Sequence, residues 1–162
     1  MAGAVFNFDA LPKTQVAAAC LFLDEEGRIL AVKPTYKPGW EVPGVGLAED
    51  GESPLEACRR EVLEEIGLDV QRVRLLAVDY REPVPGRRGN ALRFVFLGPR
   101  LREDELRRIQ LQREEVSEYC FMAPGEVMQH YPSAAARRLE ACLESLSQPG
   151  TGYLEEGRRV LG

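Results

Sequence analysis

Three glutamates lie within five positions of one segment, LEACRREVLEEI. These are Glu61, Glu64 and Glu65. At 3.6 residues per turn they fall on one arc of a helix, and carboxylates at three- and four-residue spacing repel each other. Carboxylate oxygens are the ligands that Mg²⁺ and Mn²⁺ prefer, so the pattern indicates a site for a divalent cation. The alternative is a solvated acidic face whose repulsion is relieved by Arg59 and Arg60.

The helix that must carry these glutamates is marked at both ends. Ser53 is suited to the N-cap, and Glu56 completes a capping box three residues later. Pro54 fits the first helical position, and Gly67 can adopt the left-handed conformation that ends a helix. The sequence therefore predicts a helix over 54–66, with an apolar arc on the core side that comprises Leu55, Cys58, Val62 and Ile66. The glycine-rich segment GVGLAEDGE leads into it and would let backbone groups approach a phosphate or a metal.

The composition excludes several other chemistries. His130 is the sole histidine, which excludes zinc sites that need two of them. The four cysteines form no C-x-x-C pair and are predicted to be reduced core residues. The chain has neither a Walker A loop nor a G-x-S-x-G elbow. Catalysis is therefore expected to depend on carboxylates with a metal.

Length and charge limit the class of protein. The chain has 162 residues, which fits a single domain over 1–162. Its 26 acidic and 21 basic residues give a net charge of −5, which disfavours stable binding to a nucleic acid backbone. The sequence has no apolar run long enough to span a membrane and no signal-peptide pattern. We expect a cytoplasmic protein with a small phosphorylated ligand.

Apolar periodicity predicts a single α/β domain of strands and two long helices. Residues 15–24 and 28–33 are predicted to form a β-hairpin around the turn DEEG. Further strands are expected at 73–80, 91–98 and 119–122, and a second helix at 133–147. The tail from about residue 149 has no clear period, so its order is left open. It is a candidate for contacts with the site or with a second subunit in a homodimer.

Residues 46–68, GLAEDGESPLEACRREVLEEIGL, resemble the Nudix box, Gly-x5-Glu-x7-Arg-Glu-U-x-Glu-Glu-x-Gly-U, where U is a bulky aliphatic residue. Every defined position matches, from Gly46 and Glu52 to Gly67 and Leu68. The preceding WEVPG resembles the usual approach to the box, although Pro43–Gly46 is one residue longer than the common Pro-Gly-Gly. The resemblance implies a MutT-like Nudix fold, which is an α/β/α sandwich around a mixed β-sheet.

The same resemblance implies an activity and assigns roles. It implies Mg²⁺-dependent hydrolysis, with Mn²⁺ as a substitute, of a pyrophosphate bond in a nucleoside diphosphate linked to another moiety. Water activated by the metal would attack phosphorus in line. Glu61, Glu64 and Glu65 would hold the metals, and Gly46 would also belong to the metal site. Arg60 would orient these carboxylates.

The resemblance also implies a further catalytic carboxylate in the loop before the strand at 119. The segment LQREEVSEYCFM has three candidates there. Glu115 or Glu114 is favoured over Glu118, because Glu118 adjoins the strand. As a solvated charge run is the alternative for this segment, the residue types alone do not decide between the two.

Two loops are candidates for binding the rest of the substrate. KPTYKPGW contains Tyr36 and Trp40, which can stack on a base, and REPVPGRRGN begins with Arg81. A packed aromatic anchor and a solubilising loop tip are the alternatives. The substrate is expected to be a small nucleotide, either a nucleoside triphosphate, oxidised or not, or a compound similar to ADP-ribose.

Two other functions are compatible with the fold. One is a catalytically silent regulatory module that binds a nucleotide, but such modules usually lack box carboxylates, and this chain has all of them. The other is an isomerase acting on an isoprenoid diphosphate. That activity would require catalytic cysteine and histidine partners, and His130 lies far from the box in the sequence.

Overall fold

The structure is a computed structural model that describes residues 13–83, 86 and 89–161. Its centre is a mixed six-stranded sheet in the order β3-β1-β5-β4-β7-β8. The strands are β1 (Gln15–Leu21), β3 (Gly46–Leu47), β4 (Arg74–Arg81), β5 (Ala91–Leu97), β7 (Gly152–Glu155) and β8 (Arg158–Leu161). The pairs β1–β5 and β4–β7 are parallel, and the other neighbours are antiparallel. No helix in the described residues is long and apolar enough to cross a membrane.

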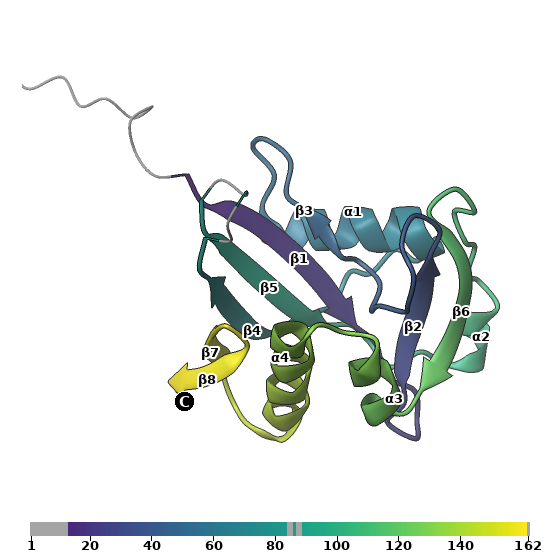
Figure 1. The fold of residues 1–162 in the computed structure, drawn as a ribbon. Coiled ribbons are helices and arrows are strands. Elements are labelled where there is room, and N and C mark those ends of the chain that lie inside the picture. Colours follow the sequence, from purple (N-terminus) through teal and green to yellow (C-terminus); the bar gives the residue numbers. More distant parts are fainter. Residues whose placement is uncertain (1–12, 84–85, 87–88, 162) are drawn as a thin grey trace, which may run out of the picture.

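A second sheet and the helices surround this centre (Figure 1). The second sheet is the antiparallel pair of β2 (Ile29–Pro34) and β6 (Val116–Met122). Helix α1 (Pro54–Ile66) lies on one face of the large sheet, and α4 (Ser133–Glu144) lies on the other. The short helices are α2 (Glu103–Leu106), α3 (Pro124–Gln129) and the 3₁₀ turn Ser145–Ser147. The predicted α/β/α sandwich around a mixed sheet is confirmed.

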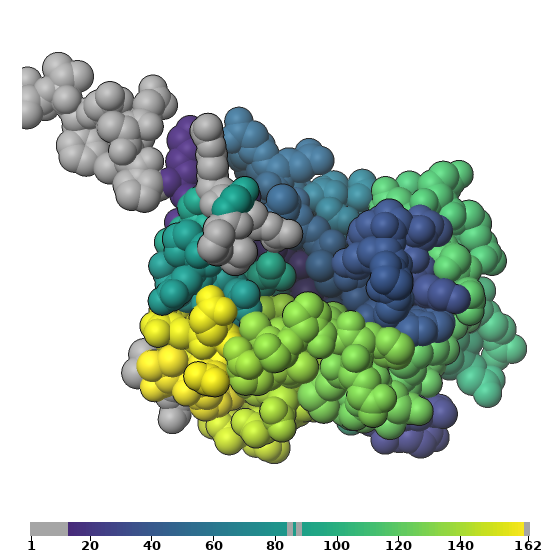
Figure 2. Space-filling view, viewed as in Figure 1, coloured from purple at the N-terminus to yellow at the C-terminus, as the bar shows by residue number. Residues whose placement is uncertain are grey.

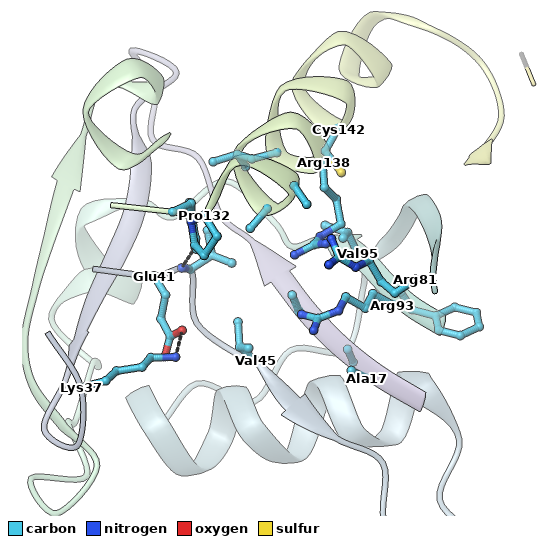
Figure 3. A pocket seen from close by; sticks show the side chains of 18 residues that line it. Ala17, Lys37, Glu41, Val45, Arg81, Arg93, Val95, Pro132, Arg138 and Cys142 are labelled. Carbon is cyan, nitrogen blue, oxygen red and sulfur yellow. Dashed lines mark hydrogen bonds and ion pairs between the residues drawn. The ribbon is translucent and has the colours of Figure 1, made fainter. Parts of the chain in front are cut away.

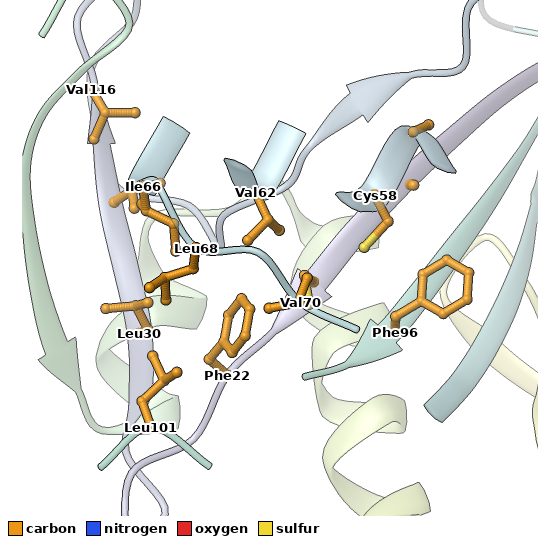
Figure 4. Close-up of a cluster of buried hydrophobic side chains, with 14 residues drawn as sticks. Phe22, Leu30, Cys58, Val62, Ile66, Leu68, Val70, Phe96, Leu101 and Val116 are labelled. Carbon is orange, nitrogen blue, oxygen red and sulfur yellow. The ribbon is translucent and has the colours of Figure 1, made fainter. Parts of the chain in front are cut away.

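Apolar side chains point alternately to the two faces of the large sheet and so form two separate hydrophobic cores. In β1 and the residues just after it, Cys20 and Phe22 pack on the α1 side, and Leu21 and Leu23 pack on the α4 side. Side chains of a strand point alternately to its two faces, so a strand covered on both sides is apolar throughout. Figure 4 shows the core on the α1 side, where Val62 of the helix meets strand residues. This packing fixes which face of α1 is turned away from the core.

The ends of α1 are those that the sequence predicts. The Ser53 hydroxyl accepts a hydrogen bond from the Glu56 amide at 3.2 Å, and the Glu56 carboxylate accepts one from the Ser53 amide at 2.9 Å. Gly67 has φ 70° and donates its amide proton to the carbonyl of Leu63. Both ends are therefore fixed by local interactions.

The prediction of a β-hairpin over 15–33 is correct at its turn and wrong for the strands on either side. Hairpin hydrogen bonds link Leu30 to Phe22 and Asp24 to Arg28, each at 3.0 Å. The strands then separate, because β1 pairs with β3 and β5, whereas β2 pairs with β6. The sequence shows the turn, but a strand's neighbour depends on residues distant in the chain.

The tail contains a hairpin that the sequence analysis did not predict. Strands β7 and β8 extend the large sheet beyond β4. Their turn has φ 51° at Glu156 and φ 76° at Gly157, the two positive values that a tight hairpin turn needs. The tail is thereby joined to the strand that leads into the loop at Arg81.

Candidate active site

Arg60 organises the acidic face of α1. Its guanidinium donates to both carboxylate oxygens of Glu52, at 2.9 and 3.1 Å. Its Nη1 donates to Glu61 at 2.8 Å and to Glu64 at 3.1 Å, and its Nη2 donates to the carbonyl of Leu47 at 3.2 Å. One cation thus joins both halves of the box segment and holds two of its three clustered glutamates.

Glu65 is held in a different way. It is buried, and its carboxylate accepts a hydrogen bond from the Gly44 amide at 2.7 Å. Burial raises the pKa of Glu65 to about 8, the Gly44 amide acts against this rise, and the charges of Glu41, Glu61 and Glu115 add to it. The sequence analysis placed Glu65 on the polar arc and did not predict its burial.

Glu61 combines both features, because it is paired with Arg60 and is also partly buried. Its partial burial raises its pKa, and so do the charges of Glu64 and Glu115, although the pairing with Arg60 opposes the rise. Gly46 lies directly against it, so that a Cβ added at Gly46 would overlap the Glu61 carboxylate. The glycine at the start of the box is therefore needed for the close approach of β3 to α1.

Glu115 comes to this group from the loop before β6. It is exposed, and its charge acts on Glu61, Glu65 and Tyr36. The loop is fastened by Thr35, whose amide donates to the Glu115 carbonyl at 2.8 Å and whose hydroxyl donates to the Glu114 carbonyl at 2.6 Å. In contrast, Glu118 forms an ion pair with Lys33 at 2.8 Å. Of the three candidates, Glu115 is the one whose charge is among the causes of the raised pKa values of Glu61 and Glu65.

Glu41 is a member of this group that the sequence analysis missed. It is buried, and it accepts hydrogen bonds from Lys37 at 2.6 Å and from the Tyr36 hydroxyl at 3.3 Å. Its charge also contributes to the raised pKa of Glu65. The one sequence signal was a carboxylate inside the otherwise apolar segment WEVPG.

The donor set fits a hard divalent cation. Within residues 13–83, 86 and 89–161, no three Asp, Glu, His or Cys side chains already enclose a point where an ion could bind. Burial raises the pKa of Glu61 and of Glu65, and the charges of neighbouring carboxylates, Glu115 among them, add to the rise. Two or more carboxylates with mutual repulsion are the chemistry that a divalent cation stabilises.

The burial of Glu65 predicts an unusual pH dependence of stability for the protein in excess chelator. Glu65 has an ordinary pKa of 4.5 when unfolded and about 8 when folded, so the folded state binds the proton more tightly between these values. Its contribution to stability is complete below pH 4.5 and is lost as the pH rises through 8. Urea unfolding of both proteins at pH 6 and pH 9 checks this. Between these two pH values, the free energy of unfolding of the wild type should fall by a few kcal/mol more than that of Glu65→Gln, on the order expected from the pKa shift. Parallel pH profiles for the two proteins would contradict the burial of a proton at Glu65.

A cavity of about 390 Å³ lies on the other side of the 41–45 segment from α1. It is bounded by that segment, by β1, β4 and β5, and by α4 (Figure 3). Glu41, Val42 and Val45 form the wall next to the glutamates, and Tyr131 supports this wall by accepting a hydrogen bond from the Val42 amide at 2.7 Å. In Figure 2 the residues after β2 (blue) and α4 with the tail (light green and yellow) form separate ridges of this face.

The three residues predicted to bind substrate are not brought together. Arg81 lines the cavity and forms an ion pair with Glu156 at 3.2 Å. Tyr36 is 67% exposed and lies beneath the ammonium group of Lys37, 5.3 Å from its ring centre. Trp40 packs against the core on the α4 side, with Lys33 over its ring at 5.7 Å. Tyr36 remains accessible beside Glu41, whereas Trp40 is mainly an anchor of its loop.

The comparisons with known proteins agree with this architecture. The family model for the NUDIX domain matches residues 13–141. The chain is 33% identical over 137 residues to an RNA pyrophosphohydrolase of Dinoroseobacter shibae, a match that covers 74% of this chain and 82% of that protein. It is 38% identical over 80 residues to human 8-oxo-dGDP phosphatase NUDT18, covering 48% of this chain but only 23% of the human protein.

A solved structure supports the fold. The MutT protein of Methanosarcina mazei Go1 matches with a TM-score of 0.66 at 19% identity, over 85% of this chain and 98% of that one. At this identity the likeness concerns the fold alone. The family model covers most of the chain, and the matched region includes residues 46–68. The chain is therefore a member of the Nudix hydrolase family.

Proposed function

We propose that this protein hydrolyses a pyrophosphate bond in a nucleoside diphosphate linked to another moiety, with Mg²⁺ as its cation and Mn²⁺ as a substitute. The observation that carries the proposal is the buried glutamate of α1, Glu65, with Glu61 and Glu115 acting on its charge beside a nucleoside-sized cavity. A Mg²⁺ ion held there supplies neutralisation of the pyrophosphate oxygens and a bound water of lowered pKa.

Each residue of the candidate site has a distinct role in this proposal. Glu61, Glu64 and Glu65 hold the cations, with Gly46 leaving the space that they need. Arg60 fixes the orientation of Glu61 and Glu64 through its hydrogen bonds. Glu115 is exposed next to them and accepts the proton that the attacking water releases. The cavity binds the moiety beyond the pyrophosphate and excludes water from it.

The relatives support a nucleotide substrate without choosing one. One relative is named for RNA with a pyrophosphate group, and the human relative is named for an oxidised deoxynucleoside diphosphate. A solved Nudix domain of 16% identity, from Shewanella oneidensis NrtR, is complexed with ADP ribose. These compounds share a diphosphate attached to a nucleoside. We therefore propose that part as the common element of the substrate.

The proposal predicts that hydrolysis depends completely on a divalent cation. A panel of nucleoside triphosphates, their oxidised forms, ADP-ribose, sugar nucleotides and dinucleoside polyphosphates should include at least one compound hydrolysed with Mg²⁺. Excess chelator should abolish that activity, because Glu61, Glu64 and Glu65 cannot approach an anionic diphosphate without a cation. Phosphate release measured with and without chelator checks this. Full turnover in chelator would contradict the metal dependence, and tight binding without turnover would favour the regulatory module.

A further inference from the structure

The cavity exists because small side chains face each other across it. Ala17 and Ala19 of β1 form its floor, and Ala134 and Ala135 of α4 lie on the opposite side. Larger apolar residues at these positions would let α4 pack directly onto the sheet, as it does further along through Leu139. The alanines therefore leave a space open beside the catalytic face.

The wall of this cavity that lies away from Glu41 contains three arginines, Arg81, Arg93 and Arg138, which we call the arginine wall. They come from β4, β5 and α4. Asp79 of β4 is the Cα partner of Arg93 in the sheet, and it pairs with Arg138 Nη1 at 2.8 Å. Arg81 is two residues beyond Asp79, so it lies on the same face of the strand. Figure 3 shows the three guanidinium groups together, across the cavity from Glu41 and Lys37.

The tail hairpin holds the arginine wall in place. Asp79 is completely buried and accepts a second hydrogen bond, from the Gly157 amide at 2.8 Å. Arg81 Nη1 lies 3.2 Å from the carboxylate of Glu156, the neighbouring turn residue. A guanidinium has five N–H donors, and each of these two ion pairs uses Nη1 in the part of the chain that the structure describes, so further donors of Arg81 and Arg138 can meet a ligand. The pairs thus orient Arg81 and Arg138 without exhausting them.

Charge makes this wall distinctive. Four cations line the cavity, Lys37 and the arginine wall, and their paired carboxylates are Glu41 for Lys37, Glu156 for Arg81 and Asp79 for Arg138. The chain as a whole has a net charge of −5. An uncharged base or sugar gains little from several guanidinium groups in one partly buried wall. An anion gains strongly, because charge-assisted hydrogen bonds are about twice as strong as neutral ones.

We propose that the arginine wall is a subsite for a phosphate monoester carried by the moiety in the cavity. A carboxylate is satisfied by one arginine through a planar two-bond contact, whereas a phosphate monoester offers three terminal oxygens and nearly two charges to the donors of Arg81 and Arg138, which come from β4 and α4. The placement of the subsite at the far end of the substrate rests on the proposed function, in which the scissile pyrophosphate lies at Glu61 and Glu65. The substrate then has an anionic group at each end.

The test measures binding in excess chelator, where no hydrolysis occurs. Ribose 5-phosphate is titrated into the ¹⁵N-labelled protein, with ribose as the uncharged match, and the arginine Nε–H signals are followed by NMR. We expect saturable shifts of Arg81 and Arg138 and a Kd at least tenfold lower for ribose 5-phosphate than for ribose. Arg81→Gln should raise that Kd about tenfold. Glu156→Gln should raise that Kd less than Arg81→Gln does, because the glutamine side chain can still accept a hydrogen bond from Arg81.

Arg107→Gln is the matched control, since Arg107 is exposed, pairs with Glu103 and does not line the cavity. It should leave the Kd unchanged.

Equal affinity for ribose and ribose 5-phosphate, or equal weakening by Arg81→Gln and Glu156→Gln, would overturn the subsite. Ribose 5-phosphate should also raise the KM for a hydrolysed nucleotide at constant kcat, and a lack of competition would overturn its place in the substrate site. The binding result stands even if no compound is hydrolysed, so the two proposals fail separately.

Discussion

Glu61→Gln should lower kcat by about 10² or more with saturating Mg²⁺, and should leave the protein in chelator as stable as the wild type. A 10² loss corresponds to about 2.7 kcal/mol of transition-state stabilisation, which is the scale expected when a metal ligand loses its charge. Stability is retained because partial burial and neighbouring glutamates already disfavour the Glu61 charge. Phosphate release and urea unfolding measure the two effects separately.

Glu56→Ala is the control from the same helix. Glu56 accepts a hydrogen bond from the Ser53 amide and forms none with Arg60. Its loss should lower the free energy of unfolding by about 0.5–1 kcal/mol and change kcat little. If Glu61→Gln retains full turnover, or if both variants merely destabilise the fold, the acidic face is structural and the proposed catalytic role of Glu61 is wrong.

The features predicted correctly from sequence are those determined by short stretches of chain. The caps of α1 depend on residues three positions apart, so Ser53 and Glu56 sufficed to predict its start. The box spacing similarly sets Arg60 within reach of Glu64 on the next turn, and the observed distance is 3.1 Å. Helical geometry alone connects such residues, and no knowledge of the sheet is needed.

The features that escaped prediction depend on contacts between distant segments. Glu41 joins the acidic group because the segment before β3 passes beside α1, and the lone carboxylate in WEVPG does not by itself show which element lies next to it. The arginine wall forms only because β4, β5 and α4 meet. The hydrogen bond that holds Asp79 beside it comes from the Gly157 amide, 78 positions away in the chain. The environment of Glu65 likewise includes the Gly44 amide, which lies 21 positions away in the chain. Periodicity reports which face of an element is apolar, but not which element covers it.

Arg60→Ala should lower kcat by about 10-fold to 10² and raise the Mg²⁺ concentration needed for half-maximal activity. Arg60 holds Glu61 and Glu64 in fixed positions and ties them to Glu52, which belongs to the start of the box. Without the Arg60 guanidinium the carboxylates repel one another, and the cation itself must bring them into position when it binds. Activity at increasing Mg²⁺ measures both parameters, and Arg60→Lys should restore only part of the loss, because an ammonium group cannot form the paired contact with Glu52.

The neighbouring arginine separates this positioning role from a general loss of charge. Arg59 donates to the carbonyl of Gln71 at 2.7 Å and forms no ion pair with the acidic group in the described residues. Arg59→Ala removes the same charge from the same turn of α1, so it should leave the Mg²⁺ dependence unchanged. Equal shifts for the two variants would mean that Arg60 acts through net charge rather than through its hydrogen bonds. A shift confined to Arg60→Ala would instead identify its guanidinium as the group that orients the glutamates before the cation binds.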